Sequence, residues 1–126
     1  MAAPNIVDVA TITGITTWKA GINTETVGVS VIVTNAASSG KVLKVNSLVA
    51  TSIGSTTGVT TKIFNKAAGV GNSVSLGSTM SVPTYSSLAV ISKEMSVYLQ
   101  EDQSIACFAQ AGLGVIDVVC SYEDIS

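Results

Sequence analysis

The sequence has 126 residues, of which 47% are hydrophobic and 11% are charged, and its formal net charge is −2. This length suits one domain with a continuous core. All six basic residues are lysines, and they are scattered along the chain. Because a nucleic-acid-binding surface needs a basic stripe, usually with arginine, the charge pattern argues against a nucleic-acid partner.

The composition favours strands over helices. Surface helices are normally rich in Glu, Lys and Arg, whereas Val, Ile and Thr are typical of strands. We therefore expect an all-β protein, with residues 1–126 forming a single antiparallel β-sandwich domain. The low charge also leaves an isolated monomer poorly protected from association, which indicates a subunit that contacts other subunits.

No segment has the features of a signal peptide or of a membrane-spanning helix. Residues 1–5 (MAAPN) lack a basic region, and no apolar run is long enough to cross a bilayer. We expect no membrane partner.

The first half of the chain contains three strand patterns. Residues 6–13 (IVDVATIT) form the first, and Gly14 is expected to interrupt it. Residues 27–34 (VGVSVIVT) alternate most clearly, and the side chains expected on the buried face are Val27, Val29, Val31 and Val33. In residues 41–50 (KVLKVNSLVA) the expected buried side chains are Leu43, Val45 and Val49, with Lys44 and Asn46 on the other face.

The second half continues with short strands and turns of small residues. Residues 51–58 form an expected loop, and residues 66–72 form a flexible link that contains Gly69 and Gly71. The predicted strands are residues 59–64, 73–82, 87–91, 96–99, 104–109 and 115–121, and residues 92–95 are the one expected helical turn. Eight or nine short strands with turn residues between them are typical of a sandwich, and we expect a jelly-roll-like one.

The two cysteines, Cys107 and Cys120, fall on the apolar faces of residues 104–109 and 115–121. If these strands form a hairpin around residues 111–114, a disulfide needs one particular register. The pattern allows a disulfide, but cysteine is often a small core residue, so we expect two buried free thiols.

Catalysis and metal binding are poorly served by these residue types. The chain has no histidine, which is the usual base for a serine or cysteine nucleophile, and two cysteines alone cannot complete a tetrahedral zinc site. Ser38, Ser39 and Lys41 lie together, but in a polar turn that does not desolvate the lysine. We expect a protein that is not an enzyme, with no catalytic residues, no metal site and no cofactor.

Glu101 and Asp102 are the remaining candidates for acid–base or metal chemistry. On an extended strand the two side chains would point to opposite faces, and no EF-hand spacing supplies the other oxygens of a calcium site. We interpret residues 100–103 as the solvated tip of a hairpin between two strands.

Four stretches together resemble small virion structural proteins of marine tailed phages, which infect cyanobacteria and related ocean bacteria. They are residues 1–7 (MAAPNIV), 35–47 (NAASSGKVLKVNS), 96–102 (SVYLQED) and 121–126 (SYEDIS). The resemblance implies a non-catalytic structural component of the virion, which is assembled in the host cytoplasm.

This resemblance leaves two locations on the particle open. Our first expectation is a head decoration (cement) protein on the capsid surface, a homotrimer that binds the major capsid protein, with residues 2–9 and 122–126 contacting the capsid lattice. The alternative is a neck, tail or fibre-associated module that binds a host receptor or glycan. It would use loops such as residues 51–58, with Trp18 and Tyr85 as the candidate aromatic residues.

Overall fold

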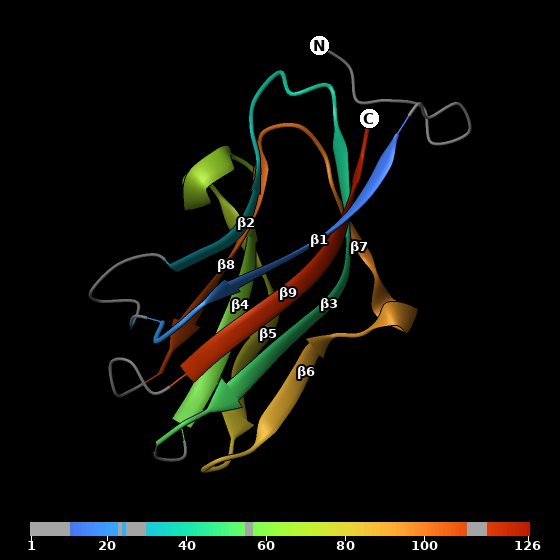
Figure 1. The fold of residues 1–126 in the computed structure, drawn as a ribbon. Coiled ribbons are helices and arrows are strands. Elements are labelled where there is room, and N and C mark those ends of the chain that lie inside the picture. Colours follow the sequence, from blue (N-terminus) through green and yellow to red (C-terminus); the bar gives the residue numbers. More distant parts are fainter. Residues whose placement is uncertain (1–10, 23, 25–29, 55–56, 111–115) are drawn as a thin grey trace.

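The computed structural model describes residues 11–22, 24, 30–54, 57–110 and 116–126. Within these ranges the chain forms nine β-strands and two short 3-10 helices (Figure 1). The strands are β1 (Ile12–Lys19), β2 (Ser30–Asn35), β3 (Val42–Ser52), β4 (Thr57–Phe64), β5 (Ser73–Val82), β6 (Ser87–Ile91), β7 (Val97–Leu99), β8 (Gln103–Ala109) and β9 (Ile116–Ile125). The helices are η2 (Ala67–Gly69) and η3 (Lys93–Met95), and η3 confirms the predicted helical turn.

The strands form two antiparallel sheets that pack face to face (Figure 1). Sheet A has five strands, in the order β1-β9-β3-β6, with β7 also paired to β3. Sheet B has four strands, in the order β2-β8-β4-β5. The predicted all-β antiparallel sandwich is confirmed, because both layers are sheets and the described helices are single turns.

Apolar side chains from the inner faces of both sheets form one core. Sheet A contributes side chains such as Leu48 and Val118, and sheet B contributes Val59 and Ile105, all with no exposed surface. Burying a side chain of this size stabilises the fold by about 1.5–3 kcal/mol relative to leaving it in water. The packing between the two sheets is therefore the main source of stability.

An irregularity in β3 changes which of its side chains face the core. The register with β9 shifts between Val45 and Ser47, so that Asn46 is an extra residue. The inward positions consequently change from odd to even numbers: Val45 is buried before the shift, and Leu48 is buried after it. The predicted placement of Val49 on the face of Leu43 and Val45 is wrong for this reason.

A similar shift in β2 turns Val31 out of the core. Val33 lies opposite Ile105 of the core, whereas Val31 lies opposite Ala106, which packs in a separate cluster on the outer side of sheet B. Val31 is accordingly half-buried, while Ile32 and Val33 are buried. The predicted common face is wrong at Val31, and Val27 and Val29 lie outside the described residues.

The hairpin predicted at residues 100–103, and the hairpin considered around residues 111–114, both join strands of different sheets. The strands at 104–109 and 115–121 do not pair with each other, because β8 belongs to sheet B and β9 to sheet A. Residues 100–102 likewise connect β7 in sheet A to β8 in sheet B. Sequence patterns indicate where strands lie, but adjacency along the chain does not determine which strands pair. Here neighbouring strands belong to different sheets, because burying the core between the two sheets favours pairing with strands that are distant in the sequence.

Both ends of the described chain meet in sheet A. β9 lies between β1 and β3, and Ile125 is opposite Ile12 on one side and Val42 on the other. The backbone of residues 122–125 is therefore engaged within sheet A, while the contact of residues 122–126 with a capsid lattice stays a prediction. Residues 2–9, the other predicted contact, lie outside the described residues.

The first strand also differs from its prediction. Gly14 lies inside β1, opposite Glu123, and does not interrupt it. A Cβ at Gly14 would meet nothing within 4 Å, so packing does not require glycine there. The ladder with β9 continues through this position because a single glycine weakens a strand only modestly.

Candidate interaction surfaces

The acidic turn at residues 100–102 is held in place by hydrogen bonds from its own residues. The backbone N–H of Gln100 donates to Oε1 of Gln103 at 2.9 Å, and the N–H of Asp102 donates to the carbonyl of Asn35 at 2.9 Å. Asp102 has a φ of 62°, a left-handed conformation that Asp adopts more readily than most residues. The turn is therefore specified by its polar side chains.

The two carboxylates of this turn point to different neighbours. Oδ1 of Asp102 accepts a hydrogen bond from the backbone N–H of Ala67 at 3.0 Å, and Oδ2 lies 3.3 Å from Nζ of Lys66. The hydrogen bond from Ala67 is the main reason that the pKa of Asp102 lies below its ordinary value, and Lys66 lowers it further. Asp102 thus fastens the turn to η2.

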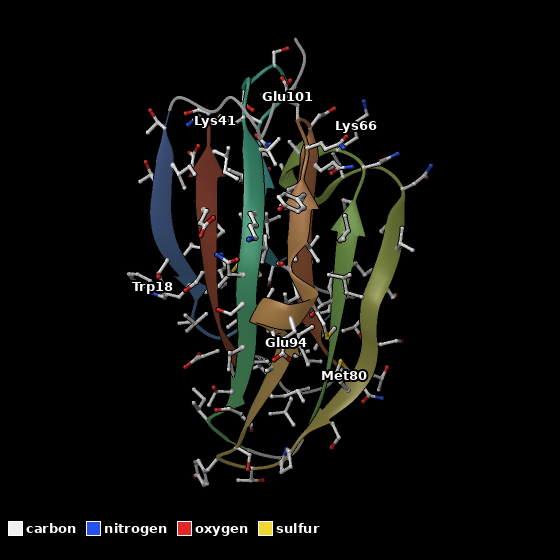
Figure 2. All side chains as sticks on the ribbon, turned by 90° about the vertical axis from the view of Figure 1, so that its right-hand side faces the viewer. Trp18, Lys41, Lys66, Met80, Glu94 and Glu101 are labelled. Carbon is white, nitrogen blue, oxygen red and sulfur yellow. The ribbon has the colours of Figure 1, made fainter. Side chains whose placement is uncertain are left out.

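Glu101 fastens the same turn to the segment between β2 and β3. Its Oε2 accepts a hydrogen bond from the N–H of Gly40 at 3.2 Å, and its Oε1 is buried with no hydrogen-bond partner within the described structure. Figure 2 shows Lys41, Glu101 and Lys66 together at one end of the sandwich. The prediction of a solvated tip is wrong in this respect, because both carboxylates act as anchors to other loops.

Residues 38–41 form the other polar group at this end of the molecule. Ser39 Oγ donates to Oδ1 of Asn35 at 2.6 Å, and Lys41 Nζ forms a salt bridge with Asp124 Oδ2 at 3.0 Å. The Lys41 ammonium is half-exposed and engaged by a carboxylate. This is the opposite of the desolvated amine that a serine–lysine mechanism needs.

A pocket of about 260 Å³ opens beside this group, and Asn35, Lys41, Tyr122 and Asp124 are among the residues that line it. Asn35 Nδ2 already donates to the carbonyls of Lys41 (2.9 Å) and Leu99 (3.1 Å). Burial, and then the negative charge of Asp124, raise the pKa of Tyr122. The amide of Asn35 and the charged groups of Lys41 and Asp124 are therefore engaged in contacts within the protein. These contacts join neighbouring strand ends and leave few free polar groups for a ligand.

The two cysteines are free thiols that lie in the core, one on each sheet. Cys107 is on β8 of sheet B and Cys120 is on β9 of sheet A, and both are buried in the same core cluster. Cys107 Sγ lies 3.2 Å from Thr61 Oγ1. Burial raises the pKa of Cys107 to about 11 and that of Cys120 to about 12. The prediction of two buried free thiols is confirmed.

The outer face of sheet A carries an apolar row that crosses four strands. The residues that lie opposite one another along this row are Trp18, Val119, Val49 and Ala89, from β1, β9, β3 and β6. Trp18 is 70% exposed and Val119 is 45% exposed. Figure 2 shows the Trp18 side chain pointing outward from β1. We call this set the Trp18 row.

Hydroxyl groups border the Trp18 row on both sides. Thr16 and Ser121 lie opposite each other on one side, with their hydroxyl oxygens 3.2 Å apart. On the other side Thr51 and Ser87 are opposite each other, with their hydroxyl oxygens 3.0 Å apart. The Trp18 row is therefore flanked by hydroxyl groups on both sides, with Asp117 opposite Thr51 on the second side.

Three exposed tyrosine and tryptophan side chains differ in how they are placed. Trp18 and Tyr98 both project from the outer face of sheet A, where Tyr98 lies opposite Lys44. Tyr85 is 79% exposed but lies in the turn between β5 and β6. Trp18 and Tyr85 were the aromatic residues predicted from the sequence. Tyr98 was not among them, although its outward direction follows from the alternation of Val97, Tyr98 and Leu99.

The outer edge of sheet B is formed by β5, and it is both apolar and exposed. One side of β5 pairs with β4, and no strand in the described ranges pairs with the other side. Val74 is 73% exposed and Leu76 is 40% exposed, and residues 73–76 are exposed on both faces of the strand. None of the ten residues of β5 is charged.

No family model matches the chain, and no curated protein matches it. Two absences hold for the part of the chain that the structure describes. No group of three or more His, Cys, Asp or Glu residues is placed to hold a metal ion, and no helix has the length and apolar character needed to cross a membrane.

Proposed function

We propose that this protein is a non-catalytic structural subunit of a tailed-phage particle, and specifically a head decoration (cement) protein that binds the major capsid protein. Four stretches of its sequence resemble virion structural proteins, as described above. The observation that carries an assembly role is the uncharged, exposed edge of sheet B at β5.

An edge of this kind is unfavourable for a protein that works as a free monomer. Soluble proteins usually protect sheet edges with lysine, proline, bulges or covering segments, because an open edge pairs with other chains. β5 has register shifts against β4, and Pro83 follows it, but Val74 and Leu76 remain in contact with water. Burial of these side chains against another subunit would stabilise an assembly.

We also infer a jelly-roll topology from the strand pairing. The antiparallel pairs are nested: β1 with β9, β2 with β8, β3 with β6 and β7, and β4 with β5. Rolling up one long hairpin produces this nesting, with the β4–β5 connection as its tip. Jelly rolls are common in viral capsid proteins and in lectins, so the topology supports a virion role by analogy of fold.

The proposed assembly is a homotrimer with cyclic symmetry. A closed ring leaves no apolar edge free to add further subunits, whereas an open arrangement of the same contact would grow into fibres. We place β5 in the contact between subunits of this ring.

The mass of the purified protein in solution tests the contact. Val74→Lys and Leu76→Lys should leave the fold intact, because both side chains are already exposed, and should convert a trimer into monomers. Tyr85→Lys is the matched control, since it also replaces an exposed apolar side chain with lysine but lies outside β5. A wild-type monomer at micromolar concentration, or a trimer that survives both β5 substitutions, would contradict the proposal.

The number of copies in purified particles tests the location. A capsid lattice is highly symmetric, so a decoration protein should be present in hundreds of copies, whereas neck, tail and fibre positions have roughly a dozen or fewer. Quantitative mass spectrometry of the particles, with the major capsid protein as the internal standard, gives this number. A count of about a dozen would contradict the capsid location and favour the neck, tail or fibre. Absence from the particles would contradict a role in the particle altogether.

A further inference from the structure

We propose that the outer face of sheet A binds a neutral oligosaccharide, with Trp18 and Tyr98 as the two stacking residues. This site goes beyond a structural role in the particle. It rests on three properties of the same face: exposed aromatic side chains, rows of hydroxyl groups, and a low charge with no excess of basic groups.

The aromatic side chains supply the surface that the apolar face of a sugar ring needs. Trp18 is 70% exposed and Tyr98 is 46% exposed, so both rings remain accessible in the folded chain. Sugar C–H groups carry a small positive charge and pack against the negative face of an aromatic ring. Val119 and Val49 extend the apolar contact from Trp18 toward the middle of the sheet.

The hydroxyl rows supply groups that can bind the rim of the sugar. Ser121 and Thr16 lie next to the Trp18 row on the side toward Tyr98, and Ser47 is opposite Ser121 on β3. The hydroxyls of Thr16 and Ser121 share one hydrogen bond, and both keep acceptor capacity for a ligand, because a hydroxyl can donate one hydrogen bond and accept two. An apolar surface with a few convergent polar groups is the usual composition of a small-molecule site.

The charges on this face argue for a neutral ligand. The next outward row contains Gly14, Glu123 and Lys44, with Glu123 and Lys44 directly opposite each other. Glu123 can accept hydrogen bonds and Lys44 can donate them. A further acid, Asp117, lies opposite Thr51 on the same face, and its Oδ1 accepts a hydrogen bond from the N–H of Gly21 at 2.8 Å. Such a face lacks the excess of positive charge that a nucleic acid, a sulfated glycan or an anionic membrane requires.

The separation of the two aromatic residues indicates an oligosaccharide, not a single sugar. Tyr98 lies three strands across from Trp18 and about four residues along the strand direction. At about 4.8 Å per strand and 3.4 Å per residue, the diagonal between them is roughly 20 Å. A chain of several sugar units can contact both rings and cross the hydroxyl row between them.

The site is independent of the proposed assembly contact. β1, which carries Trp18, and β5 lie on opposite sides of the sandwich (Figure 2). Substitutions on the two surfaces can therefore be tested separately. A failure of oligosaccharide binding would leave the assembly proposal standing, and a monomeric protein could still bind the sugar.

The experiment uses the full chain on an array of oligosaccharides, followed by titration with the bound neutral hexasaccharides. Trp18 is the sole tryptophan of the chain, so its fluorescence reports on this face alone. We expect saturable changes in the emission with hexasaccharides and much weaker changes with the corresponding monosaccharides. Trp18→Ala and Tyr98→Ala should each weaken array binding by about tenfold or more, while Val74→Lys should leave it unchanged.

Circular dichroism should show that both alanine variants fold, because the two side chains are exposed. Binding to no neutral glycan on the array would overturn the proposal, as would full binding by either folded alanine variant. A blue shift of Trp18 emission that depends on protein concentration alone would overturn it in another way, because it would show that a second copy of the chain covers this face.

Discussion

Glu101 and Asp102 hold the turn between β7 and β8 against two other segments of the chain. Both carboxylates accept hydrogen bonds from backbone N–H groups, of Gly40 and Ala67 respectively. Adjacent acids invite a catalytic interpretation, yet here each one fixes a separate loop. The sequence predicts that the pair does not converge on one substrate, but it does not reveal these partners, which are 61 and 35 residues away along the chain.

At the same scale, the buried thiols of Cys107 and Cys120 should make the fold sensitive to alkaline pH. Their pKa values in the folded chain are about 11 and about 12, above the value of 9.0 for an exposed thiol. A group with a raised pKa contributes stability that is full below its unfolded pKa and is lost as the pH rises through its folded pKa. Each thiol should therefore cost about 1.4 kcal/mol of unfolding free energy per pH unit above pH 9, until its folded pKa is reached.

Urea unfolding at pH 8, 9 and 10 measures this loss. The Cys107→Ala, Cys120→Ala double variant is the control: it should be less stable at pH 8, because two core side chains are shortened, but its stability should fall less between pH 9 and 10. Parallel pH profiles for the two proteins would show that other groups cause the alkaline loss.

At the scale of elements, the register shift between Val31 and Val33 in β2 should make these two valines differ in how strongly a substitution destabilises the fold. Val33→Asp places an unpaired charge in the core and should prevent folding. Val31→Asp places the charge on the half-buried outer side of sheet B, where it can reach water, and should cost about 1–2 kcal/mol. Thermal unfolding followed by circular dichroism distinguishes them, and equal damage at both positions would contradict the observed register.

The elements also show how far sequence reasoning reaches. Alternation correctly predicts most strand positions, since side chains on a half-buried strand must change face at every residue. It misplaces Val31 and Val49 because a bulge resets the alternation, and a bulge depends on the register with a partner strand that the local sequence does not specify. The Trp18 row was equally hidden, because its members come from four strands that are distant in the chain.

For the whole molecule, the central position of β9 in sheet A predicts that the chain cannot fold without the second half of this strand. Residues 122–125 pair with β1 on one side and with β3 on the other, and Asp124 also binds Lys41. A chain that ends at Ser121 should therefore fail to fold. Removal of Ser126 alone, which costs two hydrogen bonds to Thr11, should be tolerated.

The rate of limited proteolysis shows which of the two truncated chains is folded. The shorter chain should be digested at the rate of an unfolded protein, and the longer one should resemble the full chain. Resistance of the chain that ends at Ser121 would mean that β1 and β3 hold together without the second half of β9.

The nested pairing also sets when this protein can fold during its synthesis. A ribosome releases β1 well before its partner β9, and roughly ten seconds separate the two at an elongation rate of about 10 residues per second. During that interval β1 and one side of β3 have no strand to pair with, so the nascent chain exposes open edges to the crowded cytosol. Slow codons or neighbouring ribosomes on the same messenger RNA would lengthen or multiply that exposure, which makes yield depend on translation speed and on chaperones that shield unfinished chains.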